Sequence, residues 1–234
     1  MLRLQMQELI SIFNYEFKKM KTAIIIGTTG LTGSALLKQL LKDDDFNRVI
    51  SFSRKQIGLT DPKLVQHSID FNQISNYKEL IKGDVVFCCM GTTIKTAGSK
   101  EAFKKVDFIF PTEFAKIAKQ NGVKEFYLQS SLGADINSNN FYLKTKGEVE
   151  QILQQLNFNS FATFRPSMLL GKRSEFRFGE LIGKIIMQLL SFLFIGKLKR
   201  YKAIHVNQVA SAMIKQSKLN KPGNTVIENE EMIY

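Results

Sequence analysis

Short apolar runs alternate with stretches of helical periodicity along most of the chain. Runs rich in β-branched residues are typical of buried strands, and apolar residues spaced three or four apart are typical of helices. This pattern predicts strands at 23–26, 49–53, 64–69, 84–90, 126–129, 161–164 and 225–228. It predicts helices at 31–41, 77–81, 101–120, 141–156 and 206–215. Strands and helices that alternate through short loops predict an α/β fold with a doubly wound parallel sheet.

The length of the chain, 234 residues, fits one domain with a small appendage. We expect a single domain over 21–234, with an inserted C-terminal region at about 167–205 that covers a pocket. Residues 1–20 are expected to be an N-terminal extension that is disordered or not native, because Met20 lies directly before the first strand. A chain that starts at Met20 is therefore expected to fold.

Three glycines at intervals of three residues separate the first strand from the first helix. The first lets the chain turn sharply, the second lets a pyrophosphate approach the backbone, and the third lets the helix pack against the sheet. The N-terminus of that helix offers free N–H groups to phosphates. A P-loop is excluded because Ser34 and Ala35, rather than Lys and Ser or Thr, follow the last glycine. The sequence thus predicts a dinucleotide site at Gly27, Thr28, Thr29, Gly30, Leu31, Thr32 and Gly33.

The end of the second predicted strand indicates which dinucleotide to expect. Sites for NAD usually place Asp or Glu about 20 residues past the glycines, where it binds the ribose 2′-hydroxyl. This chain has Ser53, Arg54 and Lys55 there instead. Arg54 can grip a 2′-phosphate with its planar guanidinium, and Lys55 adds a second positive charge. We therefore predict NADP(H) as the cofactor.

Tyr142 and Lys146 are four residues apart at the start of the predicted helix 141–156, so they share one face of it. A lysine ammonium beside a phenol favours the ionised phenolate, which gives a proton donor and acceptor that works near neutral pH. Ser131, at the end of the preceding strand, can hydrogen-bond a substrate oxygen. Ser130 is the alternative if the strand ends one residue earlier.

The composition narrows the classes of partner. The formal net charge is +12 and the pI is about 9.6, which is compatible with nucleic acid as a partner. However, the lysines are scattered and no nucleic-acid-binding motif is present, so a lysine-rich surface is favoured. The two cysteines, Cys88 and Cys89, are adjacent and point to opposite faces of a strand. They cannot jointly bind a metal, and we expect no metal site.

The stretch Phe178–Gly196 is very apolar, but its uninterrupted apolar runs are shorter than the ~18 residues of a membrane span. We interpret it as a helix over a pocket. Contact with a membrane surface stays an alternative because Lys197, Lys199 and Arg200 follow. Since no secretory signal is evident and the cysteine usage fits a reducing compartment, we expect a cytoplasmic location. The sequence leaves the oligomeric state open.

Four stretches together resemble the short-chain dehydrogenase/reductase superfamily, and in particular its atypical CC3 group: Cys88–Thr93, Gln129–Asp135, Phe141–Glu150 and Phe164–Glu175. The resemblance implies a Rossmann fold and a Ser-Tyr-Lys catalytic set at Ser131, Tyr142 and Lys146. By the same resemblance, Tyr142 is the general acid/base and Lys146 binds the nicotinamide ribose. Further cofactor contacts that it implies are Asp70 at the adenine edge, Gly91, Thr92 and Thr93 near the ribose, and Arg165 and Pro166 at the nicotinamide end.

Two functions are consistent with these residues. One is an NADPH-dependent oxidoreductase that acts on a small carbonyl or a related acceptor. The other is an NADPH-binding regulatory or redox-sensing protein with little turnover. Retention of Ser131, Tyr142 and Lys146 favours the oxidoreductase, because a protein that uses NADPH only as a ligand does not need the phenol.

Overall fold

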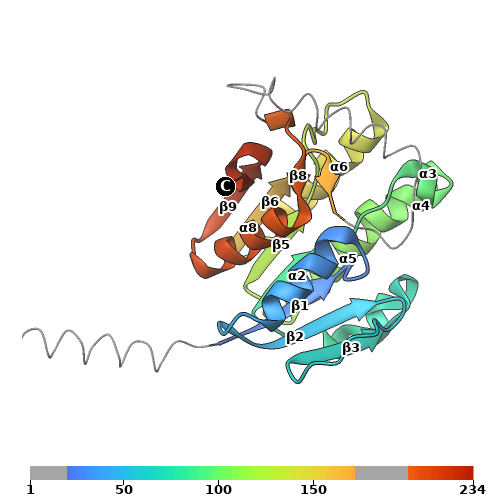
Figure 1. The fold of residues 1–234 in the computed structure, drawn as a ribbon. Helices are drawn as coiled ribbons and strands as arrows, with labels where there is room; N and C mark the ends of the chain where they lie inside the picture. The colour runs from blue at the N-terminus through green and yellow to red at the C-terminus, as the bar shows by residue number, and fades with distance from the viewer. Residues whose placement is uncertain (1–19, 172–199, 234) are drawn as a thin grey trace, which may run out of the picture.

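The computed structural model describes residues 20–171 and 200–233, and its centre is a parallel sheet of seven strands (Figure 1). The strand order is β3-β2-β1-β4-β5-β6-β9. These strands are β1 (Lys21–Ile26), β2 (Phe46–Ser53), β3 (Leu64–Ser68), β4 (Val85–Cys88), β5 (Glu125–Gln129), β6 (Ser160–Arg165) and β9 (Gly223–Glu228). A second, two-stranded sheet pairs β7 (Leu169–Leu170) with β8 (Ile204–His205). The predicted doubly wound sheet is confirmed.

Helices connect the strands and cover both faces of the sheet (Figure 1). They are α2 (Leu31–Leu41), η1 (Phe71–Leu80), α3 (Ile94–Ala97), α4 (Lys100–Lys104), η2 (Lys105–Ile109), α5 (Phe110–Gln120), α6 (Phe141–Gln155), α8 (Val206–Lys218) and η5 (Asn229–Met232).

Alternating residues of each strand build two separate cores. In β1, Ala23 and Ile25 face α2 and α8, whereas Ile24 and Ile26 face α5 and α6. Both sides of the central strands are apolar because helices cover both faces of the sheet there. Cys89 belongs to the first core and Cys88 to the second, which confirms that the two thiols lie on opposite sides of the sheet.

Two predicted helices differ from the observed ones. The segment 101–120 is interrupted by η2, a π-helix, and the periodicity of 3.6 does not reveal the extra residue that such a segment accommodates. The helix expected at 77–81 begins earlier, at Phe71, because the Asp70 carboxylate accepts a hydrogen bond from the Asn72 amide and caps η1.

Some expectations lie outside the described residues, namely those on 1–19 and on Phe178–Gly196. Within the described residues, no helix is both long and apolar enough to cross a bilayer.

The parallel arrangement brings the carboxyl ends of all the central strands to one edge of the sheet. The loops after β1, β2, β4, β5 and β6 therefore converge there, and this is where ligands bind in open α/β sheets. These loops carry the glycine turn and most of the other residues that the sequence singled out.

We predict that Gly147→Ala destabilises the fold. An alanine Cβ at this position of α6 would lie 2.9 Å from the Asp135 Cα and even nearer the Asp135–Ile136 peptide bond, which cannot move aside as a side chain could. The expected loss is about 1–3 kcal/mol of unfolding free energy in urea titrations. Gly58→Ala is the matched control, since its Cβ would meet nothing within 4 Å. Equal stability of the two variants would contradict the close packing of α6.

Candidate functional site

A cavity of about 940 Å³ lies at the carboxyl edge of the sheet. It collects residues from the segments that follow six strands, β1 to β6, so positions far apart in the sequence share one space. The predicted site residues that line it are Thr29, Gly30, Leu31, Thr32, Arg54, Asp70, Gly91, Thr92, Thr93, Ser131, Tyr142, Lys146 and Pro166.

The glycine turn is packed too tightly for any side chain. Gly27 has φ +86°, and a Cβ there would lie 2.5 Å from the Cys89 backbone at the end of β4. A Cβ on Gly33 would overlap the Gly27 carbonyl oxygen. The turn thus brings the N-terminus of α2 directly to the cavity.

The first turn of α2 fits a pyrophosphate. Gly30 is its N-cap and provides no side-chain cap, so the first amides of the helix have no partner within it. Thr32 lines the cavity and its Oγ1 is buried without a hydrogen-bond partner. Unpaired N–H groups at the positive end of a helix are what a phosphate anion needs. Thr28, a predicted cofactor contact, does not line the cavity, and its hydroxyl is buried in a hydrogen bond of 2.9 Å with Ser51.

Part of the cavity wall combines aromatic rings with positive charge. Phe71 and Phe110 line the cavity with their ring centroids 5.6 Å apart, which offers an apolar wall for an adenine. Arg54 and Lys105 line the cavity too, and the Lys105 Nζ lies 6.0 Å from the Phe110 ring centroid. Asp70 lies at the wall, but its Oδ1 accepts from Asn72 as the cap of η1.

Lys55, the residue after Arg54, does not face the cavity. Lys55 is exposed and is not among the residues that line the cavity. Its carbonyl accepts a hydrogen bond of 2.6 Å from the Ser53 hydroxyl, which closes the loop after β2. Arg54 is therefore the residue of this pair that faces the cavity.

Tyr142 and Lys146 lie on the cavity side of α6. Asn140 caps the helix by accepting from the Tyr142 amide, which places Tyr142 in the first turn. Its ring packs on Phe103, with the centroids 5.4 Å apart, and the Lys146 Nζ lies 6.0 Å from the ring centroid. The lysine stem and the phenol thus share one face, as the four-residue spacing predicts.

Lys146 is 5% exposed and forms an ion pair of 2.6 Å with Asp107 of η2. The other carboxylate oxygen of Asp107 accepts a 2.8 Å hydrogen bond from the Thr92 amide. Burial lowers the pKa of Lys146, but the negative charge of Asp107, with a smaller contribution from the phenolate form of Tyr142, outweighs burial and holds the pKa above its usual value. Burial raises the pKa of the Asp107 carboxyl, and Lys146 opposes that rise.

Both candidate serines line the cavity. Ser131 is half-buried and its hydroxyl makes only a long contact, 3.4 Å, with the Leu132 carbonyl. Ser130 is 5% exposed and its Oγ has no partner. Ser131 is thus the more accessible of the two serines.

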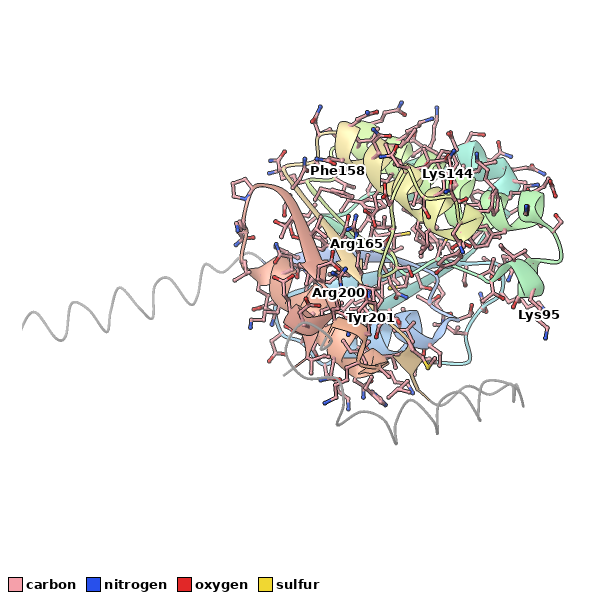
Figure 2. The ribbon with its side chains drawn as sticks, turned by 90° about the horizontal axis from the view of Figure 1, so that it is seen from above. Lys95, Lys144, Phe158, Arg165, Arg200 and Tyr201 are labelled. Atoms are coloured by element: carbon pink, nitrogen blue, oxygen red, sulfur yellow. The ribbon has the colours of Figure 1, made fainter. Side chains whose placement is uncertain are left out.

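Arg165 does not line the cavity, although Pro166 does. Its guanidinium reaches Glu150 of α6 at 2.5 Å and Glu228 of β9 at 3.2 Å, and so lies within the molecule (Figure 2). The expected contact between Arg165 and the nicotinamide end is replaced by a structural role, because two carboxylates that are distant in the sequence take up its donors.

Sequence reasoning missed Asp107, Lys105 and the aromatic pair. One signal for Asp107 was available: it occupies the buried helical stripe formed by Phe103, Phe110 and Phe114, where a carboxylate needs a partner. No comparable signal exists for Lys105, one lysine among many. Among residues 20–171 and 200–233, no group of three or more His, Cys, Asp and Glu is placed to hold a metal ion.

Residues 27–180 match a family described as NAD(P)H-binding. The rat protein HTATIP2 is 38% identical over 168 residues, which cover 70% of this chain and 69% of the relative. The mitochondrial protein FMP52 of Debaryomyces hansenii is 38% identical over 159 residues, or 66% of this chain and 69% of the relative.

Among solved structures, the Bordetella bronchiseptica enzyme WbmH in complex with NAD+ is similar, with a TM-score of 0.67 at 18% identity. The likeness covers 89% of this chain and 75% of that chain, and it shows the fold alone.

The expected cytoplasmic location is wrong by these comparisons. Relatives from several yeasts are named as mitochondrial proteins, which points to mitochondria instead. The cysteine usage on which the expectation partly rested does not distinguish between reducing compartments.

We predict that Arg165→Met lowers stability more than it lowers cofactor affinity. Removing the guanidinium leaves the buried Glu150 carboxylate unpaired, which costs on the order of 2 kcal/mol because the partners are partly exposed. Urea unfolding measures the loss, and calorimetry with NADPH measures affinity. Lys144→Met, an exposed change on the same helix, is the control (Figure 2). Weaker binding of NADPH with unchanged stability would contradict this structural role and indicate that Arg165 contacts the cofactor.

Proposed function

The chain belongs to the NAD(P)H-binding family, and we propose that it is an NADPH-dependent oxidoreductase of the atypical short-chain dehydrogenase/reductase type. Its substrate is a small carbonyl compound or a related acceptor. The observation that carries the proposal is that Tyr142, Lys146 and Ser131 line the same cavity as the glycine turn.

The cavity suits a dinucleotide along its length. The amides of the α2 N-terminus would hold the pyrophosphate, and the packed rings of Phe71 and Phe110 would form one apolar wall against the adenine. Gly91 adjoins Lys146 in the cavity wall, since a Cβ there would lie 3.6 Å from the Lys146 Nζ. NADPH, when bound, supplies the hydride for the reduction.

The side chains of the protein supply the proton that the carbonyl oxygen gains. Tyr142 donates its phenolic proton to the carbonyl oxygen, which becomes the hydroxyl of the product alcohol. Lys146 stabilises the phenolate that remains until a solvent proton restores it, and Ser131 donates a hydrogen bond that orients the carbonyl. One hydride and one proton are thus added to the substrate, and the tyrosine is regenerated.

The preference for NADPH over NADH rests on charge at the adenine end. Arg54 follows β2 and Lys105 begins η2, and both line the cavity together with Phe71 and Phe110. A 2′-phosphate carries nearly two negative charges and accepts a bidentate guanidinium contact. No acidic residue replaces Arg54 after β2, so a 2′-hydroxyl lacks its usual carboxylate partner.

We predict that Tyr142→Phe removes most of the turnover and leaves NADPH binding nearly intact. The loss of a general acid typically costs a factor of about 10²–10⁴. Turnover is measured as the loss of NADPH absorbance in the presence of each of a panel of aldehydes, ketones and quinones. Calorimetry measures the affinity for NADPH. Full activity of the variant would refute the assignment. A parent protein that binds NADPH tightly but oxidises it with no acceptor would instead support the regulatory alternative.

We predict that Arg54→Glu reverses the cofactor preference. The parent protein should bind NADPH at least about tenfold more tightly than NADH, equivalent to ~1.4 kcal/mol, and the difference should shrink as salt rises. The variant should lose NADPH affinity and keep its NADH affinity. Lys95→Glu makes the same charge change at the rim of the molecule and is the control (Figure 2). Equal dissociation constants for the two cofactors in the parent protein at low salt would overturn the proposal.

A further inference from the structure

Asp107 is a buried carboxylate in an unusual segment of helix. It lies in η2, the π-helical stretch between α4 and α5, and is 1% exposed. Its neighbours on the same helical stripe, Phe103 and Phe110, are apolar. An ionised group at such a position is costly unless it is paired, and π-helical insertions are frequent at functional sites. The Asp107 carboxylate therefore needs partners that stabilise its charge.

The two oxygens of Asp107 join two different parts of the cavity wall. Oδ1 lies 2.6 Å from the Lys146 Nζ on α6, and Oδ2 accepts from the Thr92 amide in the loop after β4. Gly91 lies directly beside this ion pair, since a Cβ there would be 3.4 Å from the Asp107 Oδ1. The carboxylate thus connects the loop that would contact the cofactor with the helix that carries Tyr142.

The remaining titratable groups around Lys146 do not supply a permanent negative charge. Burial raises the pKa of the Cys88 thiol to about 12, so it is neutral near pH 7. Tyr142 is the proton donor of the proposed reaction and is neutral when it is ready to react. Among the described residues that interact with Lys146, this leaves Asp107 as the standing anion.

We propose that Asp107 is a positioning residue of the oxidoreductase site: it keeps the buried Lys146 protonated and fixes the loop 91–93 to α6. The inference rests on the proposed function for its catalytic meaning. The protonation state of Lys146, however, can be measured without substrate or cofactor. A lysine that lost its proton could neither stabilise a phenolate nor attract a ribose hydroxyl as an ammonium.

The test compares the parent protein with Asp107→Asn, which keeps the size and hydrogen-bonding shape of the side chain and removes its charge. In protein labelled with ¹³C-lysine, the Cε signal that disappears in Lys146→Gln identifies Lys146. We expect its titration midpoint to be at least about one pH unit lower in Asp107→Asn, because burial is no longer opposed by an anion. Glu113→Gln removes an exposed carboxylate from α5 and should leave the midpoint unchanged.

A second measurement applies if the variant is too unstable for NMR. With a lowered lysine pKa in the folded state, the unfolded chain binds more protons, so the stability of Asp107→Asn should rise between about pH 7 and 9.5. In the parent protein the Lys146 pKa is raised, and this group contributes no such rise. The deficit in melting temperature should therefore shrink with pH, whereas loss of packing alone would give a constant deficit.

Calorimetry with NADPH completes the test. Its affinity for Asp107→Asn should fall as pH rises through the lowered lysine midpoint, relative to the parent protein. An unchanged lysine midpoint together with a constant stability deficit would overturn the role of Asp107. A parent protein that fails to bind NADPH would instead overturn the proposed function, while the lysine titration would still stand.

Discussion

Close contact between the β1–α2 turn and the end of β4 is the constraint on which the rest of this structure depends. Any side chain at Gly27 or Gly33 would collide with backbone atoms, 2.5 Å away in the case of Gly27 and the Cys89 backbone. Because backbone cannot yield as a flexible side chain can, the turn has one arrangement. It aims the N-terminus of α2 at the cavity and sets the distance between the glycine turn and the loop that carries Gly91 and Thr92.

One stripe of α6 carries three polar side chains, and each meets a different environment. Tyr142 faces the cavity, Lys146 pairs with Asp107 of η2, and Glu150 pairs with Arg165 of β6. The three positions follow one another at four-residue intervals, so a single helix face joins the proposed proton donor to two buried ion pairs. Buried ion pairs are weak sources of net stability but specific sources of orientation, since each fixes a side chain that could otherwise rotate.

The positively charged residues of this protein also differ in their surroundings and in their roles. Most of the lysines in residues 20–171 and 200–233 are exposed, and single exposed charges matter little for the fold. The few cations that reach the cavity differ in partner: Lys146 has a carboxylate beside it, whereas Arg54 and Lys105 line the end that would hold a 2′-phosphate. A net charge of +12 alone could not distinguish these cases.

Local pattern was enough to predict the parallel sheet, the glycine turn and the shared face of Tyr142 and Lys146, because strand alternation, φ freedom and helical spacing are properties of neighbouring residues. Two findings needed the tertiary structure. Arg165 pairs with Glu150, which is 15 residues away in the sequence, and with Glu228, which is 63 residues away. Lys146 pairs with Asp107 of another helix. A charged residue shows its type in the sequence but not its partner, since that depends on which elements pack together; the π-helix that brings Asp107 to Lys146 is likewise invisible to a periodicity of 3.6.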